Sequence, residues 1–390
     1  IVLGVFYLLK LITPKKFLSE KPYLPLLGMF ITAISPWSIM FSRAGWEVNL
    51  ATALILWGIN LFIISIKKKE INYPSLLGAV LLLILATYTY HAARIIAPIV
   101  GLMLIFLWFS QTSNSLKLIS NVQRFFNRYF NALLISAFFA LFLISPLAMN
   151  LTSNTTTQRF KETSLFADLS VIEESNTAQE LQNNIIGKLF YHRYLLFSRE
   201  VAINFFDHFR IDFLFISGDE NARHSSQYFG QLYHIEIIFL FLGTAFVINA
   251  LRKVKNDPYP LEFKNYLWFL LGWLFISIIP ASITKTTPHS LRILPSLPVF
   301  LIIITYGISY FIDQVKIILE KFNLKNSYLG KILLSIIIII YLLELSIFWR
   351  HYNLIYPVTY ANEWQGGYQQ MIKIVQDNDD GIKPIYITRE

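Results

Sequence analysis

The sequence contains no cysteine and has few charged residues. Without cysteine the chain can form neither disulfides nor thiolate metal sites, and it has no cysteine nucleophile. Charged residues make up 15% of the 390 residues, whereas about 25% is usual in soluble domains. Glycine and proline number only 16 and 15, too few for a collagen-like or low-complexity chain. These shortages exclude a soluble globule, a disordered chain and a disulfide scaffold.

Familiar motifs of soluble enzymes are missing as well. The chain has no phosphate-binding loop, no Rossmann glycine fingerprint, no HExxH zinc motif and no GxSxG nucleophile elbow. Their absence argues against soluble nucleotide chemistry.

Apolar residues are abundant instead, at 55% of the chain, and the mean hydropathy is +0.51. Crossing a bilayer takes about 20 consecutive apolar residues. The runs are continuously apolar, which predicts helices, because barrel strands would alternate. We therefore predict an all-α polytopic membrane protein with about ten transmembrane helices, the first one partial. The runs lie at 1–12, 24–42, 48–66, 74–90, 94–110, 131–149, 233–251, 265–283, 293–312 and 332–349.

Basic residues alternate between the loops that join these runs. The net charge of +9 would suit nucleic acid in a soluble protein, but in a membrane protein Lys and Arg mark the cytoplasmic loops. We therefore predict a multi-pass protein of the plasma membrane, with no nucleic-acid partner and with 151–232 and 351–390 outside the cell. The cytoplasmic loops carry Lys15, Lys16, Lys21, Lys67, Lys68, Lys69, Lys117, Arg124, Arg128, Arg252, Lys253, Lys255, Lys264, Lys316, Lys321, Lys325 and Lys331.

Four segments follow from this topology. Residues 1–150 form an N-terminal transmembrane module, and 233–350 form a C-terminal one. Between them, 151–232 is a large outer loop after the sixth helix, in which 184–209 has the spacing of a helix lying in the membrane interface. The tail 351–390 predicts the start of an outer α/β domain, with a helix at 366–376 and a strand at 384–389. Because the first apolar run is short, we expect the chain to be a fragment of a longer protein.

Polar clusters at the outer ends of the predicted helices are the candidate functional residues. A cation at a helix mouth needs water or an anionic partner, and several together favour a shared anion-binding site. Simpler interpretations stay open: snorkelling to lipid headgroups, an i,i+4 ion pair between Arg43 and Glu47, an aromatic belt, and a hydrogen-bonded turn at Asp219. The candidate substrate-binding residues are Arg43, Tyr90, His91, Arg94, Arg223, His224, Lys285, His289 and Arg292.

The order of these motifs resembles the GT-C membrane glycosyltransferases, and in particular the protein O-mannosyltransferase and aminoarabinose-transferase-like group. The resemblance covers nearly the whole chain. It rests on Ser35-Pro-Trp with Arg43 and Glu47, Tyr88-Thr-Tyr90 with Arg94 and Pro98, Phe215-Ile-Ser-Gly-Asp219 with Arg223 and His224, Pro288-His289 with Arg292, and Trp364-Gln-Gly-Gly-Tyr368.

This resemblance implies an inverting enzyme that takes a sugar from a polyprenyl-phosphate carrier on the outer face. The acceptor would be a glycan, a lipid or a protein. It implies carrier-phosphate contacts for Arg43, Arg94 and Arg292, and an acceptor or metal role for Glu47. The main catalytic acid would lie upstream of Ile1, so the fragment itself is expected to lack full activity. The resemblance also allows a divalent metal ion.

Two other functions share most of these features. A flippase or transporter of lipid-linked sugars would use the same cations, although transporters often show internal repeats and the two halves of this chain show none. A polymerase or ligase that joins whole lipid-linked glycans is the other alternative.

Overall fold

The computed structural model describes residues 1–67, 70–112, 118–150, 163–182, 184–252, 257–322 and 328–378. Over these ranges the chain is mainly helical and contains no β-strand. An isolated antiparallel bridge joins Ser164 to Thr284. The prediction of an all-α protein is therefore confirmed.

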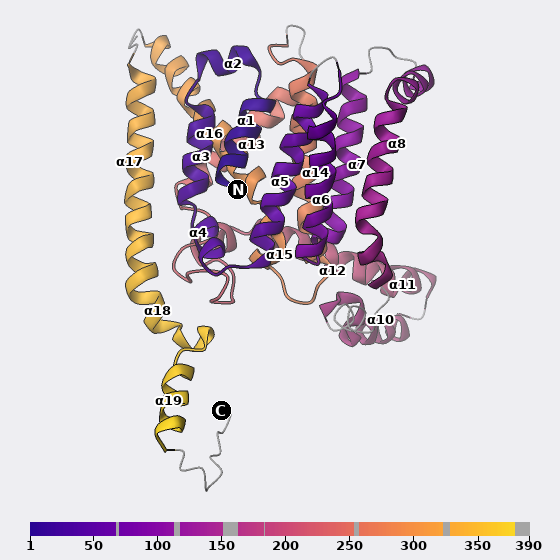
Figure 1. Ribbon diagram of the computed structural model, residues 1–390. Coiled ribbons are helices and arrows are strands. Elements are labelled where there is room, and N and C mark those ends of the chain that lie inside the picture. The colour runs from indigo at the N-terminus through magenta and orange to yellow at the C-terminus, as the bar shows by residue number, and fades with distance from the viewer. Residues whose placement is uncertain are drawn as a thin grey trace.

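Long apolar helices stand side by side as a bundle (Figure 1). They form where the sequence is continuously apolar, because a helix satisfies its backbone hydrogen bonds internally. These helices are α1 (Val2–Ile12), α3 (Leu24–Ile34), α5 (Glu47–Ile66), α6 (Tyr73–Thr89), α7 (Ala93–Thr112), α8 (Leu118–Asn150), α13 (Glu236–Leu251), α14 (Leu261–Ser282), α16 (Leu297–Lys321) and α17 (Leu329–Arg350).

The number of membrane spans is smaller than the sequence predicts. Among the described residues, six helices are long and apolar enough to cross a membrane: α5, α7, α8, α14, α16 and α17. A seventh span forms if α3 and α4 (Pro36–Arg43), bent by 54°, count as one broken helix. By contrast α1, α6 and α13 have 11, 17 and 16 residues. At about 1.5 Å per residue, α1 covers roughly half of a ~30 Å hydrocarbon layer. The prediction of about ten transmembrane helices, the first one partial, is therefore wrong in number, because α6 and α13 are short and a bend separates α3 from α4.

Close helix contact places α16 at the centre of the bundle. Its span is 89% buried, as expected for a helix that is apolar on every side. Glycines permit the contact with α13: a Cβ added at Gly307 would lie 1.9 Å from the Phe239 carbonyl oxygen, and one at Gly243 would lie 2.0 Å from the Ile303 carbonyl oxygen. Small residues thus let these two backbones touch.

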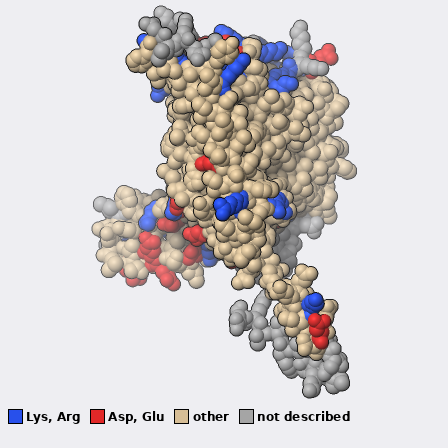
Figure 2. Space-filling model, turned by 90° about the vertical axis from the view of Figure 1, so that its left-hand side faces the viewer, with Lys and Arg blue, Asp and Glu red and all other residues tan. Residues whose placement is uncertain are grey.

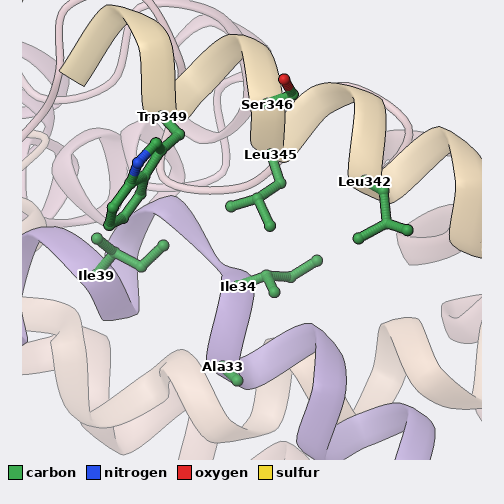
Figure 3. Close-up of a pocket in the computed structure, with 7 residues that line it drawn as sticks. All are labelled: Ala33, Ile34, Ile39, Leu342, Leu345, Ser346 and Trp349. Atoms are coloured by element: carbon green, nitrogen blue, oxygen red, sulfur yellow. The ribbon is translucent and has the colours of Figure 1, made fainter. Parts of the chain in front are cut away.

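The helices α8 and α17 lie at the edge, with spans only 6% and 17% buried. Between α17 and the α3–α4 bend runs an apolar groove of about 540 Å³ (Figure 3). The bend falls at Ser35-Pro36, where proline favours the start of a new helix. The groove is lined by Ala33, Ile34, Ile39, Leu342, Leu345, Ser346 and Trp349.

The two ends of the bundle differ in charge. Figure 2 shows Lys and Arg gathered at the end that carries α2 (Lys15–Glu20), and a broad band with few charged atoms below them. We call this the α2 end. There Lys21 forms an ion pair with Asp313 and donates a hydrogen bond to Ser309 Oγ at 2.8 Å. At the opposite end, the α12 end, lie α4, α10 (Leu169–Leu181), α11 (Ile185–Phe190), α12 (Arg193–Asp207), α15 (Ser290–Ile293) and α18 (Tyr356–Thr359) (Figure 1).

The outer loop and the tail therefore share one end of the bundle. The helix expected at 184–209 is present as α11 and α12, separated at Tyr191 and His192, and Phe205 of α12 stacks on Phe275 of α14 at 5.4 Å. The helix expected at 366–376 is α19 (Tyr368–Asn378). The strand expected at 384–389 lies outside the described residues. The part of the tail that is described is helical, so an α/β tail is not supported.

Candidate functional site

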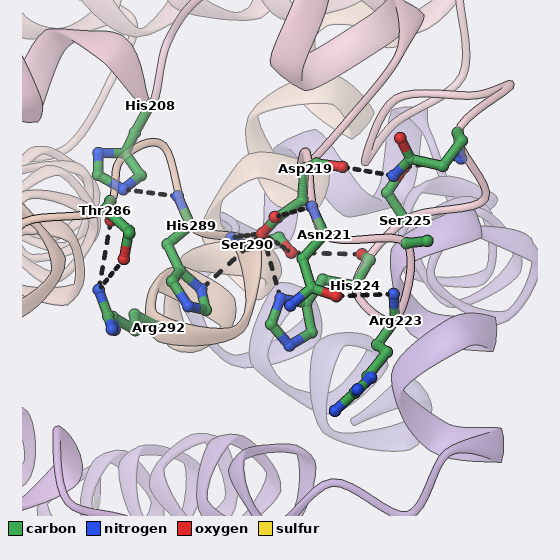
Figure 4. Close-up of polar contacts among 12 residues, drawn as sticks. His208, Asp219, Asn221, Arg223, His224, Ser225, Thr286, His289, Ser290 and Arg292 are labelled. Atoms are coloured by element: carbon green, nitrogen blue, oxygen red, sulfur yellow. Dashed lines mark hydrogen bonds and ion pairs between the residues drawn. The ribbon is translucent and has the colours of Figure 1, made fainter. Parts of the chain in front are cut away.

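The site at the α12 end is built around Asp219, His224 and His289. These residues come from two clusters far apart in the sequence, and their ligating atoms all lie within 4.8 Å of one another. His224 Nδ1 is 3.4 Å and His289 Nδ1 is 3.8 Å from Asp219 Oδ2. Figure 4 shows the two imidazoles on either side of the carboxylate. We refer to these three residues as the Asp-His-His cluster.

Asp219 is fixed by its turn and by its hydrogen bonds. Gly218 precedes it with φ of +82°, a backbone conformation that favours glycine. Asp219 Oδ1 accepts the Asn221 N–H at 2.9 Å, and Oδ2 accepts the Ser290 N–H at 2.7 Å and the Ser290 hydroxyl at 2.8 Å. Burial opposes ionisation, but the adjacent imidazoles outweigh it and lower the pKa of Asp219 to about 2. The carboxylate is therefore an anion at neutral pH.

His289 is held by α12 through two of its residues. His208, at the C-terminal end of α12, accepts the His289 backbone N–H at 3.2 Å through Nε2, and its Nδ1 lies 2.7 Å from the Asn204 carbonyl oxygen. Asn204 itself donates to the carbonyl oxygens of Ser282 and Thr284 at 3.2 and 3.3 Å. Asn204 of α12 and His208, which directly follows this helix, thus hold the loop that presents His289.

The protonation states suit metal binding. Burial lowers the pKa of His289 to about 3, with the nearby Arg292 acting in the same direction. Burial likewise lowers the pKa of His208 to about 4. His289 is therefore neutral at pH 7, which is the form that ligates metals.

Two imidazole nitrogens of the cluster lack hydrogen bonds. Both His224 Nδ1 and His289 Nδ1 are buried and make none within the described part of the chain. Buried polar atoms are nearly always satisfied, so two such atoms aimed at one carboxylate fit a bound cation. One carboxylate and two imidazoles suit a transition metal such as Zn²⁺ or Mn²⁺. The cluster is thus a candidate metal centre.

Arg292 lies beside His289 (Figure 4). It is half-buried, and its Nη1 donates to the hydroxyl of Thr284 and, at 3.1 Å, to that of Thr286. A guanidinium held in this way places a permanent positive charge next to the cluster. The structure therefore brings together His224, His289 and Arg292, three of the residues predicted from the sequence. Lys285, another predicted residue of this region, is exposed, and its backbone N–H donates to the Thr163 carbonyl oxygen at 3.1 Å.

Arg43 and Glu47 do not form the ion pair that their spacing suggests. Gly45, with φ of +67°, separates α4 from α5, so the two residues do not share a helix face. Arg43 turns instead toward α17 and the tail: Nη1 donates to Asn353 Oδ1 at 3.3 Å, and the guanidinium lies 4.9 Å from the centre of the Tyr352 ring. Glu47 is exposed at the start of α5.

The other residues predicted from the sequence lie outside the Asp-His-His cluster. Arg94 is half-buried and donates through Nε to the Thr87 carbonyl oxygen at 3.3 Å, which ties it to the end of α6. In the same turn Tyr90 is buried and His91 is exposed. Arg223 is exposed beside the cluster, with Nε 3.5 Å from Glu363 Oε2 of the tail.

Sequence reasoning missed Asn204, His208 and Ser290, and it treated Asp219 as part of a hydrogen-bonded turn. Asn204 and His208 are four residues apart on an amphipathic helix, so both face the same way. That spacing is the signal that could have identified them. The contact of Asp219 with Ser290 joins segments 71 residues apart, so no local pattern in the sequence predicts it.

Comparisons with protein-family models, with curated proteins and with solved structures found no match. The functional argument therefore depends on the site itself.

Proposed function

We propose that this protein is a membrane glycosyltransferase that moves a sugar from a polyprenyl-phosphate-linked donor to an acceptor outside the cell. The observation that carries the proposal is the buried Asp-His-His cluster beside Arg292, at one end of an apolar helical bundle. The order of motifs in the sequence adds support. Lysine-rich loops at the α2 end favour a cytoplasmic location for that end, which leaves the site facing outward.

The chemistry requires charge stabilisation at the leaving phosphate. In the transfer, an acceptor hydroxyl oxygen attacks the anomeric carbon, the bond from that carbon to the phosphate oxygen breaks, and the lipid phosphate departs. Arg292 offers donors for the departing phosphate. A divalent ion held by Asp219, His224 and His289 would supply further positive charge at the same place. Attack opposite the leaving group inverts the anomeric centre.

The acceptor proton requires a base. Glu47 directly follows Trp46, whose ring centre lies 5.6 Å from that of His224. A carboxylate there can accept a hydrogen bond from the acceptor hydroxyl and orient it, and the proton passes to the main catalytic carboxylate that the resemblance implies. We assign Glu47 to the acceptor side.

The carrier's prenyl chain requires apolar surface. The groove between α17 and the α3–α4 bend supplies it, and Arg43 reaches across from the end of α4 to Asn353 beside it. We propose that the chain lies along this groove, with its phosphate directed toward the α12 end.

Sugar transfer in liposomes tests the proposal. With the purified full-length protein and a radiolabelled polyprenyl-phosphate sugar, we expect Asp219→Asn and Arg292→Ala to lower transfer about 100-fold or more. Lys285→Ala, an exposed cation on the same loop, is the matched control and should stay within about threefold. Unchanged transfer in both site variants would overturn the assignment, and carrier translocation without a transfer product would indicate a flippase.

A further inference from the structure

A row of aromatic rings leads from the Asp-His-His cluster to the surface. The ring centres of His289 and His224 are 4.9 Å apart, those of His224 and Trp46 are 5.6 Å apart, and those of Trp46 and Trp364 are 6.5 Å apart. The row joins the α14–α15 loop, the outer loop, the start of α5 and the tail. Its outermost member, Trp364, keeps 42% of its surface exposed.

Trp364 is held in place by hydrogen bonds that point inward. Its Nε1 donates to Tyr356 Oη at 2.7 Å, and Tyr356 Oη donates to the Ala222 carbonyl oxygen at 2.5 Å. Ala222 lies two residues before His224, so the tail is tied to the loop that forms the site. Gln365 follows with φ of +57° and turns the chain away from the ring.

This arrangement differs from an ordinary aromatic belt at a membrane interface. Belt tryptophans direct the indole N–H toward water and headgroups, whereas the Trp364 N–H is used inside the protein. The Trp46 Nε1 is buried and makes no hydrogen bond to any described residue. An exposed indole, that of Trp364, therefore lies against a second indole whose N–H is buried.

Polar groups flank the two indoles. Arg223 and Glu363 form an ion pair at 3.5 Å between the outer loop and the tail, and both side chains are nearly half exposed. Flat apolar rings beside charged hydrogen-bonding groups suit a pyranose. One face of such a sugar carries C–H groups that pack on the negative face of an aromatic ring, while its hydroxyls reach the groups at the edge.

We propose that Trp46 and Trp364 form a sugar-binding subsite that holds a hexopyranose unit next to the Asp-His-His cluster. The inference rests on the proposed function and adds the residues that recognise the sugar. The exposed part of Trp364 packs on the ring of the sugar, Arg223 and Glu363 at its edge hydrogen-bond the hydroxyls, and Trp46 supports the Trp364 indole from inside.

Saturation-transfer NMR on the detergent-solubilised full chain tests the subsite. The probe is methyl α-D-mannopyranoside, without lipid donor or added metal. We expect saturation of its ring protons by wild type, a loss of at least fivefold in Trp364→Ala, and retention in Trp364→Phe, which keeps an aromatic face. Trp268→Ala removes a tryptophan that is 62% exposed on α14, and it should behave as wild type.

Trp46→Phe supplies a second arm that does not depend on the tail. It keeps a ring against His224 and removes part of the aromatic surface that supports Trp364, so saturation should fall about twofold or more while the thermal midpoint stays near that of wild type. No saturation with wild type, or equal saturation in Trp364→Ala, would overturn the subsite. If wild type transfers sugar but shows no saturation, the subsite alone is refuted. If wild type shows saturation that depends on Trp364 but transfers no sugar, the proposed enzyme is refuted.

Discussion

Asp219 shows how much of the site depends on single residues. Its carboxylate accepts hydrogen bonds from Asn221 and Ser290 and still faces two imidazole nitrogens that make no hydrogen bond to any residue the structure describes. Burying imidazole nitrogens without hydrogen bonds costs desolvation free energy, and a cation bound by these nitrogens would offset that cost. The arrangement around Asp219 therefore predicts that the protein binds a metal ion.

We predict that the purified, tag-free chain binds about one transition-metal ion, through the three ligands of the cluster. Because a ligand that binds only the folded state stabilises it, Mn²⁺ or Zn²⁺ at about 100 times its Kd should add ~2.7 kcal/mol and raise the Tm. Elemental analysis and melting with and without EDTA measure both effects.

His289→Gln should remove the bound metal and the rise in Tm together. The matched control is His192→Gln, which changes an exposed histidine at the start of α12. Equal metal content in the two variants would contradict the ligand assignment.

At the scale of elements, the sequence predicts local features well and contacts between distant segments poorly. Continuous apolar runs give the helices α5, α7, α14 and α16, because burial and backbone satisfaction act locally. The Arg43–Glu47 spacing misleads because Gly45 ends one helix before the next begins. Asp219 and His289 lie close together because α12 and His208 hold the loop that contains His289. The hydrophobic periodicity of the sequence does not predict such a contact between distant segments. The sequence does bring out His224, His289 and Arg292 as polar residues at helix ends, but not as neighbours.

Contact between α13 and α16 provides a test of helix packing. Gly307→Ala places a Cβ against the backbone of Phe239, and we expect destabilisation of about 1–3 kcal/mol with a lower Tm. Gly101→Ala is the control, because the nearest atom to its new Cβ is 4.0 Å away, and it should be neutral or stabilising by up to ~1 kcal/mol. Equal melting of the two variants in detergent would show that the two backbones are not in contact.

At the scale of the whole molecule, charge separates the two ends of the bundle (Figure 2). Lysines gather at the α2 end, and the Asp-His-His cluster lies at the other. Since cytoplasmic loops collect basic residues, the orientation in the membrane decides whether the site meets extracellular substrates.

The absence of cysteine makes this orientation measurable. We predict that Glu173→Cys, exposed on α10, reacts with a membrane-impermeant maleimide in intact cells. Lys16→Cys, exposed on α2, should react only after the membrane is permeabilised. Labelling in the reverse pattern would place the site in the cytoplasm and contradict the proposed donor.

The tail contributes Trp364 to the row of aromatic rings, so the site depends on segments from the whole length of the chain. The Asp-His-His cluster and the row of aromatic rings contain residues from all four segments. These are Trp46 from 1–150, His224 from 151–232, His289 from 233–350 and Trp364 from 351–390. All four segments therefore have to be inherited together for the site to persist. Recombination at any of these boundaries would leave apolar helices, yet it would separate residues that meet in the Asp-His-His cluster and in the row of aromatic rings.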